Sequence, residues 1–164
     1  MSDTDLLRHT LATLAYRAQR VIVDVPPGFE GTTAGGSTRG AGHILAHIGD
    51  VLDWADRMAI GDETWEMQAA TDWDSDVQRI YAALGRLDER VVSGLADNCP
   101  AERLFQGPLA DALTHIGQLA MLRRVAGSPV AGENFFVADV AGEYLTEFLE
   151  CRAEVHDDEQ AIDR

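Results

Sequence analysis

Cysteine is scarce in this sequence, which has two among its 164 residues, Cys99 and Cys151. They stand in unrelated contexts and no CxxC pair occurs, which excludes a thiol-rich zinc site and gives no support to a disulfide framework. Long apolar runs are missing as well, so no membrane span is expected. The first residues, MSDTDLLRHT, open with acidic side chains and lack an apolar signal core, and we therefore expect a cytoplasmic protein.

Basic residues are also few. The chain carries 28 acidic and 13 basic residues, and its formal net charge is -15 at pH 7. Such a chain repels the phosphates of nucleic acids and anionic lipids, and no basic patch offsets that repulsion. The composition therefore speaks against nucleic acid and membrane partners, and the acidity itself is typical of a soluble surface.

Signature motifs of several enzyme classes are absent. The chain has no HExxH motif, which argues against a zinc protease of that kind, and no Glu-x-x-His pair, which argues against a di-iron carboxylate bundle. It also has neither the G-x-S-x-G of many hydrolases nor the Walker-type loop of nucleotide-binding proteins. No catalytic residue is assigned from motifs.

Four segments show the spacing of apolar residues that is typical of amphipathic helices, and no strand pattern or internal repeat stands out. We therefore predict an all-α fold, a four-helix bundle with a long crossover loop between helices 1 and 2. Residues 24–42, rich in Gly, Thr and Pro, would form that loop. The predicted helices cover residues 4–23, 38–60, 74–95 and 108–126.

Capping residues and composition suggest the boundaries. Ser37 or Thr38 can cap the second helix, because their hydroxyls accept from free N–H groups at a helix start. Beyond the fourth helix, residues 132–150 predict one or two short helices. We divide the chain into a bundle domain, residues 1–150, and a polar, acidic C-terminal tail, residues 151–164.

The predicted fourth helix begins at Pro108, since proline suits a first turn, and it carries polar residues where apolar ones are expected. Asp111, His115 and Gln118 fall within about 60° of one another on the stripe predicted to be most buried. Asp111 and His115 are four residues apart, so their side chains project from adjacent turns of one face. A buried carboxylate needs a partner and a neutral imidazole can coordinate a metal, so this pair forms half of a metal site.

The second helix offers the other half. If the second and fourth helices pack side by side, His47 faces Asp111 and His115, and two imidazoles with one carboxylate match a facial triad for a divalent transition metal. Such a triad leaves open positions for water or substrate. Two alternatives stay open. The Asp111–His115 pair is only a local hydrogen bond, with the carboxylate favoured by the helix dipole in the first turn, or His43 and His47 form a competing site.

Two stretches resemble the DinB-like superfamily of bacterial proteins, which includes the YfiT-like proteins and the mycothiol-dependent maleylpyruvate isomerases. They are ILAHIGDVLDWADRM, residues 44–58, and LADALTHIGQLAMLRRVAGSPVAGENFF, residues 109–136. The resemblance extends from the second helix to about Asp139. It implies a four-helix bundle with a long crossover, often a homodimer, in which three side chains near one end hold a divalent metal.

Members of that superfamily commonly use one histidine on the second helix and an HxxxH pair on a later helix. His47 matches the first and His115 the last, while Asp111 stands where the middle histidine would be. The usual Arg-Gly-Gln after the final histidine is Ile-Gly-Gln here. The resemblance thus implies that zinc, nickel or iron is held by His47, Asp111 and His115, and that Gln118 orients one of these ligands.

Characterised members include thiol-dependent transferases and isomerases, in which the metal lowers the pKa of a low-molecular-weight thiol. The resemblance therefore implies a metal-dependent enzyme that transfers a small thiol to a small-molecule electrophile, or a related hydrolase. His43 and Glu133 are candidates for its general base. The alternative is a non-catalytic, metal-containing stress or ligand-binding protein, and a third interpretation is a bundle with a satisfied polar pair and no metal.

Overall fold

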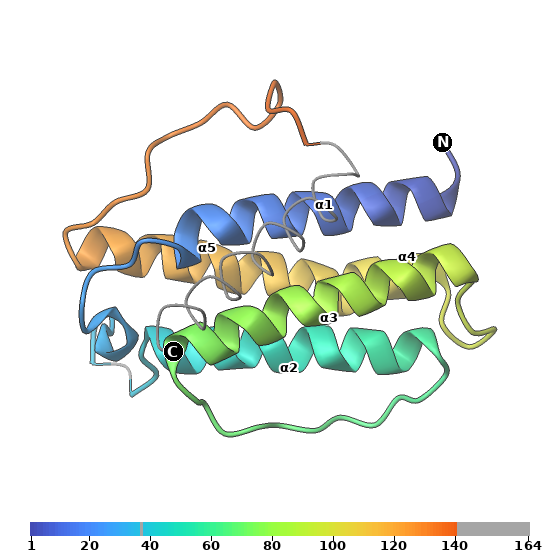
Figure 1. The fold of residues 1–164 in the computed structure, drawn as a ribbon, viewed down its shortest axis with the longest axis horizontal. Coiled ribbons are helices and arrows are strands. Elements are labelled where there is room, and N and C mark those ends of the chain that lie inside the picture. The colour runs from blue at the N-terminus through green and yellow to red at the C-terminus, as the bar shows by residue number, and fades with distance from the viewer. Residues whose placement is uncertain (37, 141–164) are drawn as a thin grey trace, which may run out of the picture.

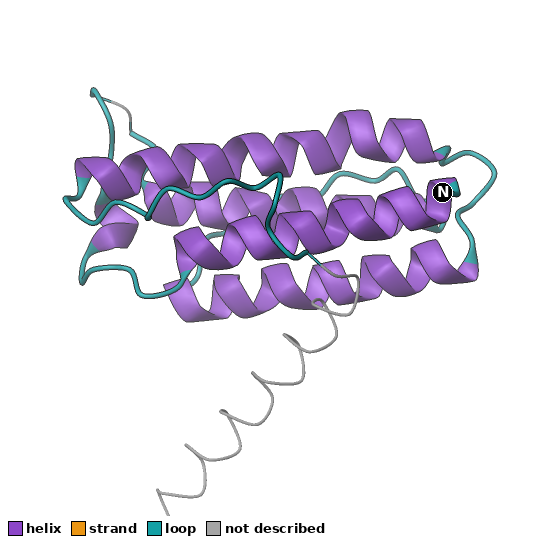
Figure 2. Ribbon diagram, turned by 90° about the horizontal axis from the view of Figure 1, so that it is seen from above, coloured by secondary structure: helices purple, strands orange, loops and turns teal. Residues whose placement is uncertain are grey.

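The computed structural model describes residues 1–36 and 38–140, and every regular element in these residues is helical. Figures 1 and 2 show long helices packed side by side, which confirms the predicted all-α class. None of the helices described is long and apolar enough to cross a membrane. The long helices are α1 (Asp3–Ile22), α2 (Ala41–Ala59), α3 (Trp73–Ser93) and α5 (Ala110–Val125). The short elements are the 3-10 turn η1 (Phe29–Gly31), α4 (Ala101–Leu104) and the π turn η2 (Phe105–Leu109).

Local capping explains where α1 and α3 begin. Ser2 and Asp5 form a capping box at the start of α1, in which the N–H of Asp5 donates to the Ser2 hydroxyl at 3.1 Å and the N–H of Ser2 donates to the Asp5 carboxylate at 2.8 Å. Asp72 accepts the N–H of Ser75 at 2.9 Å and caps α3. The predicted first and third helices are confirmed to within two residues at each end.

The second helix starts later than predicted. It begins at Ala41, its N-cap is Gly40, and no side chain caps it. Thr38 is therefore not the cap, and Ser37 lies outside the described residues. The reason is a close approach of two main-chain segments: a Cβ on Gly40 would lie 2.8 Å from the carbonyl oxygen of Glu30 in η1. That contact requires glycine and places the start of α2.

The order of the helices around the bundle differs from their order in the chain. Each of α1 and α2 packs against both α3 and α5, so α1 and α2 lie diagonally opposite each other. The described parts of the connection between them, residues 23–36 and 38–40, lie at one end of the bundle in Figure 1. The segment that runs the full length of the bundle is instead residues 60–72, because α2 and α3 start at the same end and the chain must return between them (Figure 1). We call residues 60–72 the return segment.

The core lies where the apolar stripes of the four long helices meet. Leucine and isoleucine side chains dominate it, and burying each of them contributes about 1.5–3 kcal/mol relative to exposure. Those with no exposed surface include Leu11, Leu14, Leu45, Ile48, Leu52, Ile80, Leu84, Leu87 and Leu119.

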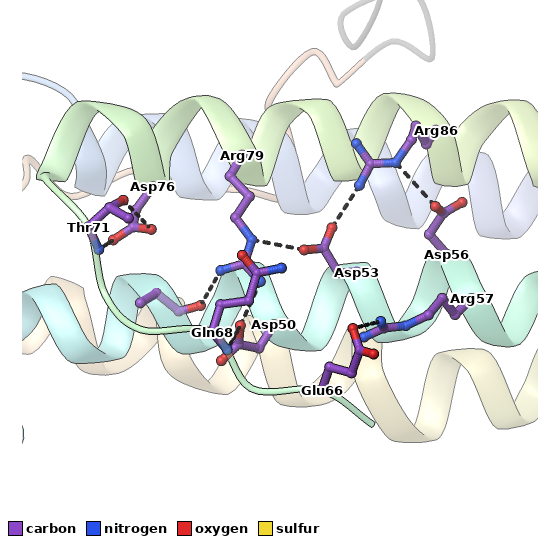
Figure 3. A network of polar contacts seen from close by, with 11 residues as sticks. Asp50, Asp53, Asp56, Arg57, Glu66, Gln68, Thr71, Asp76, Arg79 and Arg86 are labelled. Atoms are coloured by element: carbon purple, nitrogen blue, oxygen red, sulfur yellow. Dashed lines mark hydrogen bonds and ion pairs between the residues drawn. The ribbon is translucent and has the colours of Figure 1, made fainter. Parts of the chain in front are cut away.

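A row of charged side chains joins α2 to α3 along one side of the bundle (Figure 3). Arg79 on α3 donates to Asp50 at 2.6 Å and to Asp53 at 2.8 Å. The Asp50 side chain is 2% exposed, and it also accepts the N–H of Gln68 in the return segment at 3.1 Å. The row therefore fixes both α3 and the return segment to α2. Its other ion pairs are Arg86–Asp53, Arg86–Asp56, Arg90–Asp56 and Arg57–Glu66.

The fourth long helix begins earlier than predicted. Helical structure runs without a break from Ala101 through η2 into α5, and Pro108 lies inside it instead of in its first turn. A proline within an α-helix lacks an N–H donor and its ring crowds the carbonyl four residues earlier. The wider π turn accommodates both effects, so the helix continues past Pro108.

Residues after α5 run back over α1 as an extended strap. Gly127, with φ +74°, ends the helix as predicted, and no helix forms between it and residue 140. The strap is held by Glu133, which accepts the Tyr16 hydroxyl at 2.5 Å and pairs with Arg20 at 3.0 Å. The remainder of the short helices predicted for residues 132–150, and the predicted tail at residues 151–164, lie outside the described residues.

Candidate metal centre

Two helices that are distant in sequence bring three candidate ligands together. His47 comes from α2, and Asp111 and His115 come from α5, which packs against α2. One ligand atom from each side chain can be chosen so that all three atoms lie within 4.8 Å of one another. The proximity predicted from the two helical faces is therefore confirmed, and metal binding by these residues stays a prediction.

The aspartate lies between the two imidazoles. Its Oδ2 is 3.9 Å from Nε2 of His47, and its Oδ1 is 3.5 Å from Nε2 of His115. The two imidazole rings meet edge to face with centroids 4.7 Å apart. Ligand atoms bound to one zinc-sized ion at about 2.1 Å are at most about 4.2 Å apart, and each of the two aspartate distances is within that limit. The donor set of two nitrogens and one carboxylate suits a divalent transition metal.

The electrostatics favour the form of histidine that binds metals. Burial lowers the pKa of His47, and the neighbouring His115 lowers it further, against the opposing effect of Asp111 and Asp50. The neutral imidazole therefore persists to lower pH than in a free histidine. Metal binding requires that neutral form, because a protonated imidazole has no lone pair to donate.

Gln118 holds the His115 ring from the far side. Its Oε1 lies 3.1 Å from Nδ1 of His115, one turn further along α5. When Nδ1 carries the proton and donates it to this amide oxygen, Nε2 is left with its lone pair on the side of Asp111. The contact predicted for Gln118 from the resemblance is thus present, and it would fix the orientation of the ring.

Trp65 of the return segment forms a wall next to His47. Its indole meets the His47 ring edge to face at 5.9 Å and the Trp54 ring at 5.5 Å. Trp54 in turn donates its Nε1–H to the carbonyl oxygen of Glu63 at 3.1 Å. The sequence carries no local signal that the return segment would reach the site.

The other candidates from the sequence lie elsewhere. His43 is exposed and does not belong to the three-residue cluster. Glu133 is bound to Tyr16 and Arg20 on α1 and is not part of the cluster either. The Cys99 thiol is buried. Its pKa is raised mainly by this burial and to a smaller extent by the negative charge of Glu63, which makes the thiol a poor nucleophile.

The helix-dipole explanation for Asp111 loses force in this structure. A carboxylate gains from the dipole within the first turn of a helix, and the effect falls off beyond that turn. The continuous helical stretch that contains Asp111 begins at Ala101, more than two turns earlier. The predicted burial of this stripe is wrong at Asp111, because its side chain is 49% exposed, so solvation of the carboxylate also permits this position. Comparisons of the chain with family models, curated proteins and solved structures found no match.

Proposed function

We propose that this protein is a divalent-metal protein of the DinB-like type whose metal is held by His47, Asp111 and His115. The observation that supports it is the convergence of these three donors from two helices. His47 and Asp111 are 64 positions apart in the sequence, so their proximity is not a consequence of local spacing. A local hydrogen bond between Asp111 and His115 gives no reason for His47 to join them.

The activity that we propose is metal-dependent transfer of a small thiol to an electrophile, or a related hydrolysis. A bound divalent metal supplies Lewis acidity, which lowers the pKa of a thiol or water at neutral pH. The chain's own residues would orient the donors and restrict access. Gln118 holds the His115 ring through Nδ1, and the Trp65 indole covers one side of His47, where it limits contact with bulk water.

Asp111 gives this centre a particular character. It is an anionic ligand, and it lowers the net positive charge of the site compared with three neutral histidines. Its side chain is 49% exposed, whereas that of His115 is 16% exposed, so the open side of the cluster lies toward the aspartate. A substrate would therefore approach on the Asp111 side.

Metal analysis of the purified, untagged protein tests the proposal directly. We expect one equivalent of a divalent transition metal, and we expect His47→Ala and His115→Ala each to lose most of it. His43→Ala is the matched control, since it removes an exposed histidine one turn away on the same helix. Full occupancy in the double variant His47→Ala/His115→Ala would refute the site. Loss of metal in His43→Ala alone would instead support the competing His43–His47 site.

A screen of small thiols against electrophiles and hydrolysable esters tests the activity separately. Turnover should require the metal and should be abolished by His115→Ala. If the metal-loaded protein consumes no substrate above the metal-free control, the non-catalytic alternative, a metal-containing stress or ligand-binding protein, replaces the enzyme.

A further inference from the structure

A cavity of about 230 Å³ lies in the groove between α2 and the helical stretch that precedes α5. Its apolar lining includes Trp54 and Met58 of α2 and Pro108 of η2. Polar side chains complete it, among them Glu63 of the return segment and Arg103 of α4. The cavity lining thus combines an apolar surface with a few charged side chains, as is typical of sites for small organic ligands.

The cavity adjoins the metal centre along both helices. Trp54 follows His47 by seven residues on α2, which is two turns and about 10 Å along the same face. On α5, Asp111 follows Gly107 of the cavity lining by about one turn. The cavity thus lies after the metal ligand on α2 and before the metal ligands on α5. Since α2 and α5 run in opposite directions in Figure 1, both steps from the metal ligands to the cavity lead toward the same end of the bundle. The Trp65 indole contacts both His47 and Trp54, so it stands where the metal centre and the cavity meet.

Arg103 is the basic residue of the cavity lining. Arg57, Arg79 and Arg86 each bind a carboxylate. No ion pair of Arg103 is present in the described part of the chain, although acidic residues outnumber basic ones by 28 to 13. An exposed guanidinium at the edge of an apolar cavity is well suited to a carboxylate, which it can bind through two parallel hydrogen bonds.

Glu63, the acidic residue of the lining, forms no ion pair with Arg103 in the described residues. The carboxylate of Glu63 lies 3.4 Å from the Asn98 amide nitrogen, which donates to it, and the carbonyl oxygen of Glu63 accepts from Trp54. Glu63 therefore binds the loop between α3 and α4 through Asn98, and it binds α2 through Trp54. The cation of Arg103 remains available to a ligand.

We infer that this cavity binds the organic substrate of the metal centre and that this substrate is a small carboxylic acid with an apolar body. Its carboxylate binds Arg103, its apolar body lies against Trp54 and Met58, and its other end extends past Trp65 toward the metal ligands. The inference rests on the proposed function, because it assigns a substrate class to that same site.

Binding of phenylacetate to the full-length protein tests the inference, with 2-phenylethanol as its uncharged counterpart. The protein is first treated with a chelator, so that no metal can coordinate the carboxylate, and binding is followed by calorimetry and tryptophan fluorescence. We expect saturable binding of phenylacetate that Arg103→Gln weakens about tenfold, the effect of losing one charge-assisted contact. Arg124→Gln is the matched control, since Arg124 is exposed on α5 and does not line the cavity. It should leave the affinity unchanged.

Two results would overturn the inference. One is an equal effect of Arg103→Gln and Arg124→Gln on phenylacetate, which would show that only the net charge matters. The other is an equal loss of phenylethanol binding in Arg103→Gln, which would show that the variant damages the cavity. Failure of the metal site is detected independently: metal analysis would then show no bound metal, while phenylacetate could still depend on Arg103.

Discussion

Arg79 is the cation that two carboxylates of α2 share, and Arg79→Met should therefore be strongly destabilising. The Asp50 side chain is 2% exposed and lies 2.6 Å from the guanidinium, and Asp53 lies 2.8 Å from it. Removing one partner of a buried ion pair costs about 3–5 kcal/mol, because the remaining charge is left without compensation. Asp50 keeps the N–H of Gln68 and Asp53 keeps Arg86, so we expect a loss near the lower limit, about 3 kcal/mol.

The matched control is Arg86→Met in the same row. The Arg86 side chain is 44% exposed, and its partners Asp53 and Asp56 retain Arg79 and Arg90. Exposed pairs of this kind contribute at most about 1 kcal/mol. Urea unfolding followed by the helical circular dichroism signal, with a chelator present, measures both losses without a contribution from metal binding. In thermal unfolding, Arg79→Met should lower the Tm by roughly 6–12 °C and Arg86→Met by less than about 4 °C.

A second variant separates the buried charge from the lost packing. Asp50→Asn in the Arg79→Met background removes the unpaired carboxylate while keeping its shape, and it should restore part of the stability. Equal losses in Arg79→Met and Arg86→Met, or no recovery in the double variant, would refute the reasoning that burial of Asp50 sets the magnitude.

Three further results are expected. Chelation should lower the Tm, since a ligand at a hundred times its Kd stabilises the folded state by about 2.7 kcal/mol. The Tm of His115→Ala should not change on chelation, and an equal decrease in the unchanged protein and in this variant would contradict the site. The raised pKa of the Cys99 thiol means that less thiolate is present at a given pH, so iodoacetamide should label Cys99 slowly in the folded protein. Mass spectrometry of the Cys99 peptide should show that labelling becomes faster as the pH rises and much faster in urea. Gly49→Ala should destabilise despite a helix-propensity gain of about 1 kcal/mol, because its Cβ would lie 3.1 Å from the fixed guanidinium of Arg79. Gly117→Ala, with no atom within 4 Å of its Cβ, should be stabilising in the same urea assay.

Much of the helical framework could be predicted from local signals. The apolar spacing in α1 and α3 and the caps at Ser2 and Asp72 act within a few residues, so they can be recognised in the sequence alone. The same holds for the shared face of Asp111 and His115, which follows from their separation on one helix. Their meeting with His47 was conditional on α2 packing against α5, and only tertiary packing determines that pairing.

The features that were missed depend on contacts between distant segments. The return segment has no local pattern that places it, and its position is set by Asp50 and by Arg57 on α2, which bind Gln68 and Glu66. These contacts, together with the hydrogen bond from Trp54 to the Glu63 carbonyl, bring Trp65 to His47. The start of the fourth helix was predicted at Pro108 because proline is common in first turns, whereas the π turn at this point lets the helix continue through it.

The diagonal placement of α1 and α2 has a consequence for how the chain could be divided. The return segment separates a first half, with α1 and α2, from a second half, with α3 and α5. The main contacts between the long helices are α1 with α3, α1 with α5, α2 with α3 and α2 with α5, and each of them joins one half to the other. Neither half could therefore bury its own apolar faces, and two fragments produced by a cut within residues 60–72 should be obligate partners. The candidate metal centre is divided in the same way, with His47 in one fragment and Asp111 and His115 in the other, so metal would bind only to the reassembled pair.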